Sequence, residues 1–199
     1  MNYSKDLIDF LNVSPVNYHA VKEVARRLDN AGYKYLSAEE KLGEVKAGDK
    51  FYVTKNDSSI YAFQIGKQTL GEAGFHIICA HSDSPTFRIK PNAEMTCERG
   101  MTKLNTEVYG GPIMSTWFDR PLSIAGRVII KTDDVMHPET RLLKVERPVL
   151  LIPNLAIHFN RQVNDGVKLS KQKDMLPIIG IVNDGLEKGN MLMNLICSE

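Results

Sequence analysis

Apolar and polar residues in the first third of the chain alternate with the period of helices. Between Lys5 and Asn12 there is a short apolar stripe made of Leu7, Ile8, Phe10 and Leu11. After Ser14-Pro15, apolar residues recur every three or four positions as far as Ala31. Ser can cap a helix and Pro suits its first position, so this dipeptide predicts a helix start. Gly32 predicts the end of that helix, whose apolar face we expect to pack on a sheet.

Strand-like patterns follow these two helices. Residues 51–54 and 60–65 are rich in aromatic and β-branched side chains and are separated by the turn-forming residues 56–59, which predicts a β-hairpin. Residues 75–80, Phe-His-Ile-Ile-Cys-Ala, form a continuous apolar run. Such a run is typical of a strand covered on both faces, so we expect it to be buried.

The distribution of polar and apolar residues along the chain changes after Pro91. Residues 92–110 are polar, and strand-like runs then recur at 122–131, 141–145 and 149–152. Residues 191–197 have a helical pattern that runs almost to Glu199, and this predicts a fragment or a chain that needs a partner. The fold class is therefore α/β, with helices on a mixed sheet in the first part and a β-rich second part. We expect a domain boundary near residues 91–95.

Composition narrows the classes of function. The chain has 199 residues, of which 43% are hydrophobic and 25% charged, as in an ordinary globular protein. A net charge of +1 predicts no nucleic-acid partner and no anionic membrane partner. We find no apolar run of the ~18 residues that cross a bilayer and no signal-peptide pattern. The three cysteines lack metal-type spacing and predict reduced thiols in the cytoplasm.

The sequence Cys79-Ala80-His81-Ser82-Asp83 contains the best candidate for chemistry. Residues i and i+2 of a strand point to the same side, so a His and a carboxylate at this spacing can act together. His81 is a candidate metal ligand, and Asp83 a carboxylate that orients it. The alternative is a turn in which Asp83 caps a backbone N–H group beside a structural His.

Two further stretches carry weaker signals. Residues 109–122 contain Gly-Gly-Pro and then Trp117, Phe118, Asp119 and Arg120. They read either as a structural corner with an Asp119–Arg120 ion pair or as a subunit interface, where Trp and Arg are enriched. Residues 152–161 carry His158 on an apolar stretch, and a lone His of this kind is more often structural than catalytic.

Together these stretches resemble the M18 family of metalloaminopeptidases, the aspartyl aminopeptidase family. The resemblance rests on Ala80-His81-Ser82-Asp83-Ser84-Pro85, on Ser115 to Arg120 after Tyr109-Gly110-Gly111, and on Ile152 to His158. It implies that residues 1–92 form part of a catalytic domain, and residues 93–199 an inserted, β-rich dimerisation domain that is incomplete at its C-terminal end.

The resemblance also implies roles for single residues. His81 would bind one of two zinc ions per active site, other divalent metals being an alternative, and Asp83 would support that His in catalysis. His158 would reach the active site of a neighbouring subunit and contact the peptide substrate. The family assembles from dimers into dodecamers and removes the N-terminal residue of peptides, with Asp and Glu as the candidate residues.

The chain departs from the family in length. Members are much longer, and their bridging Asp, their general-base Glu and their later ligands lie in a second half. We therefore predict that this chain alone binds metal weakly and is inactive. The alternatives are a truncated, non-catalytic subunit for assembly or interaction, a separately encoded second half, and a related dinuclear aminopeptidase of the tetrahedral type.

Overall fold

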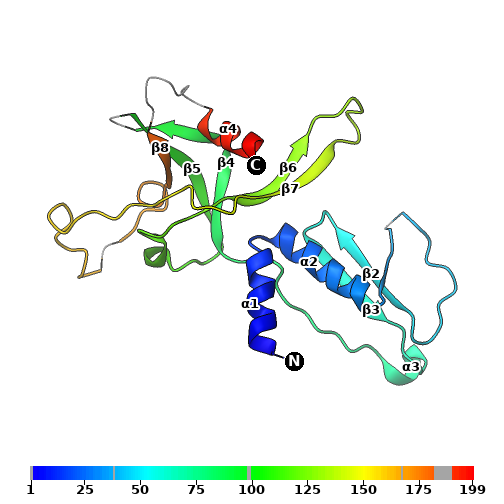
Figure 1. The fold of residues 1–199 in the computed structure, drawn as a ribbon. Helices are drawn as coiled ribbons and strands as arrows, with labels where there is room; N and C mark the ends of the chain where they lie inside the picture. Colours follow the sequence, from blue (N-terminus) through cyan, green and yellow to red (C-terminus); the bar gives the residue numbers. More distant parts are fainter. Residues whose placement is uncertain (1, 38, 98–99, 167, 182–189) are drawn as a thin grey trace. The chain divides into compact units, whose positions relative to one another are not determined.

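The computed structural model describes residues 2–37, 39–97, 100–166, 168–181 and 190–199. The chain divides into two compact units, each built from two segments of sequence. Unit 1 comprises Met1–Ser84 and Gly126–Leu142, and unit 2 comprises Pro85–Ala125 and Leu143–Glu199. The mixed α/β class predicted from the sequence is confirmed, with helices and small sheets in both units (Figure 1).

Unit 1 begins with the two predicted helices, α1 (Tyr3–Val13) and α2 (Asn17–Asn30). The predicted start of the second helix is wrong by two residues, because α2 begins at Asn17 after Val16 as its N-cap. Ser14 instead ends α1, because its backbone N–H donates to the carbonyl of Leu11 at 3.2 Å. Gly32 follows α2 with a φ of +80°, as expected for a residue that stops a helix.

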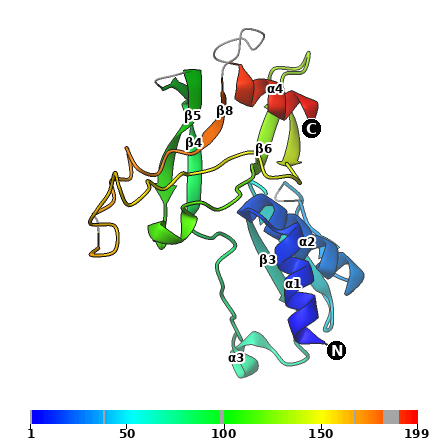
Figure 2. The same cartoon turned by 60° about the vertical axis from the view of Figure 1, so that its left-hand side comes forward.

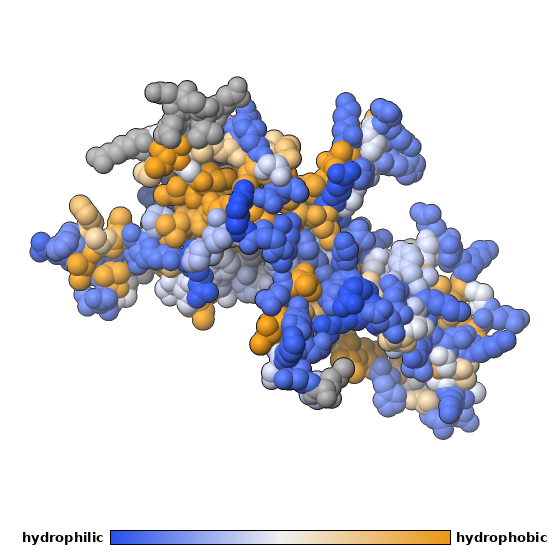
Figure 3. Space-filling model, in the orientation of Figure 1, coloured by the Kyte–Doolittle hydropathy of each residue, from blue (hydrophilic) through white to orange (hydrophobic). Residues whose placement is uncertain are grey.

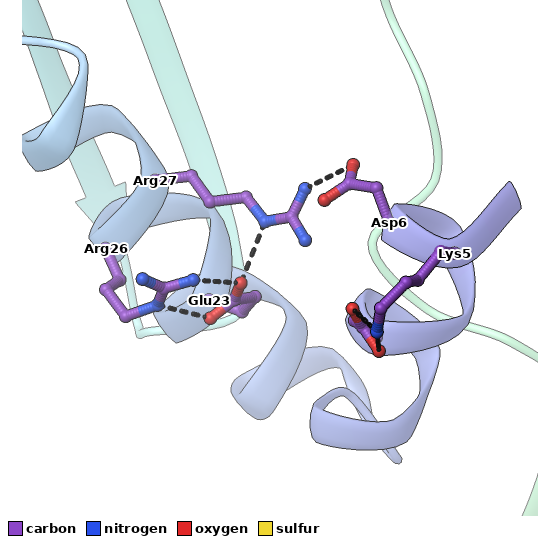
Figure 4. Close-up of polar contacts among 6 residues, drawn as sticks. Lys5, Asp6, Glu23, Arg26 and Arg27 are labelled. Carbon is purple, nitrogen blue, oxygen red and sulfur yellow. Dashed lines mark hydrogen bonds and ion pairs between the residues drawn. The ribbon is translucent and has the colours of Figure 1, made fainter. Parts of the chain in front are cut away.

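Among the described ion pairs, that of Arg27 with Asp6 joins α1 to α2 (Figure 4). The Arg27 guanidinium bonds both Asp6 of α1, at 2.9 Å, and Glu23 of its own helix, at 2.8 Å. Glu23 also receives two bonds from Arg26, each 2.7 Å long. The hydrogen bond from Arg26 is the largest cause that lowers the pKa of Glu23 to about 2, against an opposing contribution from burial.

The sheet of unit 1 has the order β1-β2-β3, formed by β1 (Lys34–Tyr35), β2 (Lys50–Lys55) and β3 (Ser59–Gln64). Strands β2 and β3 form the predicted hairpin, and its turn places Asn56 and Asp57 at φ values of 52° and 53°. These two residue types accept the left-handed conformation more readily than most. Helix α2 packs on the sheet through Ala20 and Val21, and Tyr52 donates a hydrogen bond to Asp29 at 2.9 Å.

The predicted buried strand at residues 75–80 is wrong. After the short helix α3 (Leu70–Ala73) the chain forms no strand, and every residue of this segment is exposed, Ile78 to 97%. Figures 1 and 2 show it as an extended connection that leads from α3 to β4. A strand needs a neighbour for its backbone hydrogen bonds, and among the described residues none pairs with this segment. His76, which lies within this segment, is exposed as well.

Unit 2 is built on β4 (Thr86–Thr96), β5 (Met101–Tyr109) and β8 (Ile178–Ile181), in that order across the sheet. The register of β4 against β5 shifts between Ile89 and Glu94, around Pro91, which has no N–H group for the ladder. The predicted domain boundary at residue 92 falls within β4, and the functional assignment of the two parts stays a prediction.

The core of unit 2 lies along one face of β5. Thr102, Leu104 and Thr106 alternate inward and are buried, and they face the segment that leads into β8. The Thr106 hydroxyl donates to the carbonyl of Met175 at 3.2 Å, and the Leu104 N–H to that of Pro177 at 2.8 Å. Figure 3 shows apolar side chains gathered over the β4, β5 and α4 part of this unit.

The remaining elements match the sequence patterns in part. The runs at 122–131 and 141–145 correspond to the hairpin of β6 (Ala125–Ile130) and β7 (Glu139–Lys144). The run at 149–152 makes isolated bridges instead of a full strand, to Leu122, Phe118 and Ile178. The final helix α4 (Met191–Ser198) confirms the prediction for residues 191–197, and Glu94 of β4 accepts the Leu192 N–H at its start, at 2.7 Å.

Candidate metal and substrate site

His81 and Asp83 lie together in the extended connection of unit 1. The Nδ1 atom of His81 is 3.2 Å from Oδ1 of Asp83. The His81 side chain is 92% exposed, and that of Asp83 is 33% exposed. Between them, the Ser82 hydroxyl donates to the carbonyl of Ser58 at 2.9 Å, which fastens the connection to the turn between β2 and β3.

This contact favours one tautomer of the neutral His81 ring. An ionised carboxylate can only accept hydrogen bonds, so a neutral ring that donates to Asp83 does so from Nδ1 and keeps its lone pair on Nε2. A carboxylate behind the ring in this way is the usual support of a metal-binding His. The pair therefore fits a zinc site as one ligand and its orienting group.

A catalytic zinc ion needs three protein ligands and an open position for water. In the part of the chain that the structure describes, no three His, Cys, Asp or Glu side chains gather in a manner that could hold a metal. Among the described residues, His81 and Asp83 offer one candidate ligand and its support, which is fewer donors than a catalytic zinc site requires.

A second His–Asp contact shows that the geometry alone does not define a metal site. In the loop between β6 and β7, Nδ1 of His137 lies 2.7 Å from Oδ2 of Asp134. The same carboxylate accepts the Met136 N–H at 3.0 Å, and the hydrogen bond from His137 is the largest cause lowering the pKa of Asp134. This pair closes a loop, and it provides a matched control for His81.

His158 lies in unit 2, in a turn at residues 157–159, and its side chain is exposed. The turn is closed by the Ala156 carbonyl, which accepts the N–H groups of Phe159 at 2.8 Å and Asn160 at 3.2 Å. The turn therefore presents His158 on the surface, as a residue that contacts a substrate or a partner must be.

The stretch around Trp117 forms a corner of unit 2. The 3₁₀ helix η2 (Met114–Trp117) sets Trp117 edge-on to Phe87 of β4, with ring centroids 4.7 Å apart. The Asp119 carboxylate accepts the backbone N–H of Asn154 at 2.9 Å, and among the described ion pairs none joins it to Arg120. Sequence reasoning missed this partner, because nothing local links positions 119 and 154.

Comparison with known proteins identifies the family of this chain. The family model described as "Aminopeptidase I zinc metalloprotease (M18)" matches residues 10–195. The chain is 49% identical to the probable M18 family aminopeptidase 2 of Clostridium novyi (strain NT) and 52% identical to that of Clostridium acetobutylicum (strain ATCC 824). Each alignment covers 199 residues, which are all of this chain and 46% of the relative. The chain thus spans less than half the length of these relatives.

Solved structures show the same likeness. A chain of the cryo-EM structure of the Ape4 and Nbr1 complex matches 98% of this chain with a TM-score of 0.89 and 36% identity, over 39% of its own length. The S. cerevisiae mApe1 dodecamer matches 92% with a TM-score of 0.74 and 29% identity, also over 39% of its length. From residue 10 to residue 195, therefore, this chain belongs to the M18 family of zinc metalloproteases, the family of aminopeptidase I.

Proposed function

We propose that this chain forms the first part of a metal-dependent aminopeptidase that removes the N-terminal residue from peptides, with Asp and Glu as the candidate residues. Family membership supports the activity, and the observation that carries the proposal is the His81–Asp83 contact, which leaves Nε2 of His81 exposed. His81 would hold one of two zinc ions in the complete site. Such an ion, when bound, supplies a deprotonated water and stabilises oxyanion charge.

In this proposal each residue has a separate task. His81 binds through Nε2, and Asp83 holds the proton of Nδ1 and so keeps the ring in the binding tautomer. His158 contacts the peptide substrate at the active site of a neighbouring subunit. The relatives are longer than the part that this chain matches. In this proposal, a segment that resembles their unmatched part supplies the further ligands and the general base.

We propose that residues 1–92 belong to the catalytic domain and residues 93–199 to a dimerisation domain. The dodecamer of S. cerevisiae mApe1 supports a homo-oligomer, from dimer to dodecamer. The three cysteines are free thiols, which supports a reducing, cytoplasmic location. None of the described helices has the length and apolar character that crossing a membrane requires.

The first test is metal binding and peptide hydrolysis by the 199-residue chain itself. With zinc, cobalt or manganese added, we expect weak binding and no turnover, because His81 and Asp83 leave most of the coordination sphere to water. Turnover that disappears in His81→Ala would contradict this expectation of inactivity.

The second test begins with the coding sequence beyond codon 199. If the reading frame continues, its full-length product is assayed; if an adjacent frame encodes the second half, that product is assayed together with this chain. We expect peptide hydrolysis that His81→Ala abolishes and that Asp83→Asn lowers by about 10–100-fold. His137→Ala is the matched control, since it removes another highly exposed His with a carboxylate partner. Equal losses in His81→Ala and His137→Ala would contradict the assignment of the metal ligand.

A non-catalytic subunit for assembly or interaction is the second candidate function. The observation in its favour is the exposed apolar segment, where Phe75, Ile77 and Ile78 are 77%, 78% and 97% exposed. A stop codon after residue 199, with no partner frame and no hydrolysis, would favour this function over the enzyme.

A further inference from the structure

Asp119 has a backbone conformation that its neighbourhood must maintain. Its φ is +54°, in the left-handed region, and among the described non-glycine residues only Asn56 and Asp57 share this property. Those two form the turn of the β2–β3 hairpin, which accounts for their conformation. Asp119 instead follows η2, beside the bridge between Phe118 and Ile152. The left-handed conformation costs Asp less than it costs most residues with a side chain, and the contacts of Asp119 help to hold it.

The contacts of Asp119 lie on both sides of Pro153. Its backbone N–H donates to the Ile152 carbonyl at 2.9 Å, and its carboxylate accepts the Asn154 N–H at 2.9 Å. Pro153 has no N–H group, so Asp119 binds the nearest backbone acceptor before it and the nearest donor after it. Ile152 is 0% exposed, so one end of this clamp is anchored in the core of unit 2.

Two separate local contacts shape the segment between this clamp and His158. The Asn154 side chain accepts the Leu155 N–H at 2.9 Å, and the Ala156 carbonyl closes the turn that contains His158. Leu155 and Ile157 are 61% and 52% exposed, so side-chain packing holds this segment little. The two hydrogen bonds with Asp119, one donated and one accepted by it, hold the segment where it leaves Ile152.

We propose that Asp119 is the positioning residue of His158. Its left-handed backbone and its carboxylate fix the path of residues 153–158 and so the place where the imidazole is presented. The inference rests on the proposed contact of His158 with substrate, and it concerns the path of the loop, which is measurable without any activity.

Three variants separate the two features of Asp119. Asp119→Asn keeps an oxygen acceptor in a residue type that accepts the left-handed region, Asp119→Gly keeps the backbone freedom without the acceptor, and Asp119→Ala lacks both. Asp174→Ala is the matched control, because it removes another carboxylate of unit 2 that accepts a backbone N–H, that of Ser170 at 2.6 Å.

The first measurement is hydrogen exchange of the Asn154 amide by NMR in the 199-residue chain, with the buried Leu104 amide as the reference for global unfolding. We expect Asn154 to exchange about tenfold faster in Asp119→Gly and Asp119→Ala, while Leu104 does not change in the Gly variant. Asp119→Asn and Asp174→Ala should leave Asn154 protected. Should Asp119→Ala fail to fold, the Gly and Asn variants still decide the matter. Protection of Asn154 that persists in Asp119→Gly overturns the inference.

The second measurement is steady-state kinetics of the active assembly that contains this chain. We expect His158→Ala and Asp119→Gly each to raise KM. The double variant should have the same KM as His158→Ala alone. Unchanged kinetics in His158→Ala would refute the proposed role of His158 and leave the exchange result for Asp119 intact. An effect of His158→Ala with none of Asp119→Gly would refute the positioning role alone.

Discussion

Single residues in this chain matter most where backbone conformation and hydrogen bonding coincide. Gly32, Asn56, Asp57 and Asp119 all have positive φ, and each lies where the chain changes direction. The first three were predictable, because Gly after a helix and Asn-Asp between two strands are local signals. Asp119 was not, since its partner lies 35 positions away in the sequence.

We predict that Gly32→Ala destabilises the protein by about 1 kcal/mol, through the left-handed conformation alone. A Cβ atom at Gly32 would meet nothing within 4 Å, so no steric clash contributes. Gly66→Ala is the control, since Gly66 has equally open space and no positive φ. Urea denaturation measures both, and equal midpoints for the two variants would contradict the prediction.

At the scale of elements, the local hairpin and the helices were predictable, and the sheet partners were not. The β2–β3 hairpin follows from one apolar pattern and one turn. Residues 75–80 carry an equally good strand pattern, but no described segment lies beside them to complete it. Strands β4 and β5 were not predicted, because their sequence is polar. This polar composition concealed the inward alternation of Thr102, Leu104 and Thr106. The His81–Asp83 contact was predictable, because only two positions separate its members.

The ion pairs of Glu23 with Arg26 and Arg27 within α2 predict a pH dependence of stability. The pKa of Glu23 falls from 4.5 to about 2 in the folded protein, so the contribution of Glu23 is fully present above pH 4.5. It is lost as the pH falls from 4.5 towards 2. We expect about 0.5–1 kcal/mol of the unfolding free energy to depend on this carboxylate, as for ion pairs near a surface.

Denaturation by urea at a series of pH values measures this dependence. Glu23→Gln should be less stable than the parent at pH 6, and the difference should shrink as the pH approaches 2. Glu40→Gln, in an exposed turn, is the control and should follow the parent throughout. A constant difference between Glu23→Gln and the parent over this range would refute the assignment.

At the scale of the whole molecule, the chain passes between its two units three times. The change in composition near residue 92 predicts one boundary, whereas the contacts divide the chain after residues 84, 125 and 142. Composition cannot reveal that Gly126–Leu142 groups with the first unit, because that grouping depends on contacts distant in sequence. Contacts such as that of Arg127 with the Asn56 carbonyl, at 3.0 Å, carry it.

The exposed apolar segment at residues 75–80 predicts that the 199-residue chain binds hydrophobic dyes. Exposed apolar patches bind hydrophobic dyes such as anilinonaphthalene sulfonate, and Ile77 and Ile78 are among the most exposed apolar residues described. We expect the double variant Ile77→Ser, Ile78→Ser to lower the dye fluorescence. The control, Val135→Ser with Met136→Ser, removes side chains of similar exposure from a short loop and should lower it less. An equal loss in both double variants would refute a special role for the segment.

The hydrogen bond from Thr106 to Met175 joins residues 69 positions apart. Closing so long a loop costs chain entropy before any contact rewards it. By contrast, the β1-β2-β3 sheet and its two helices are complete by Gln64. During synthesis on the ribosome the first sheet can therefore form early, and β4 can pair with β5 soon after it. The other edge of β5 stays unpaired until the segment from Met175 to β8 has left the exit tunnel.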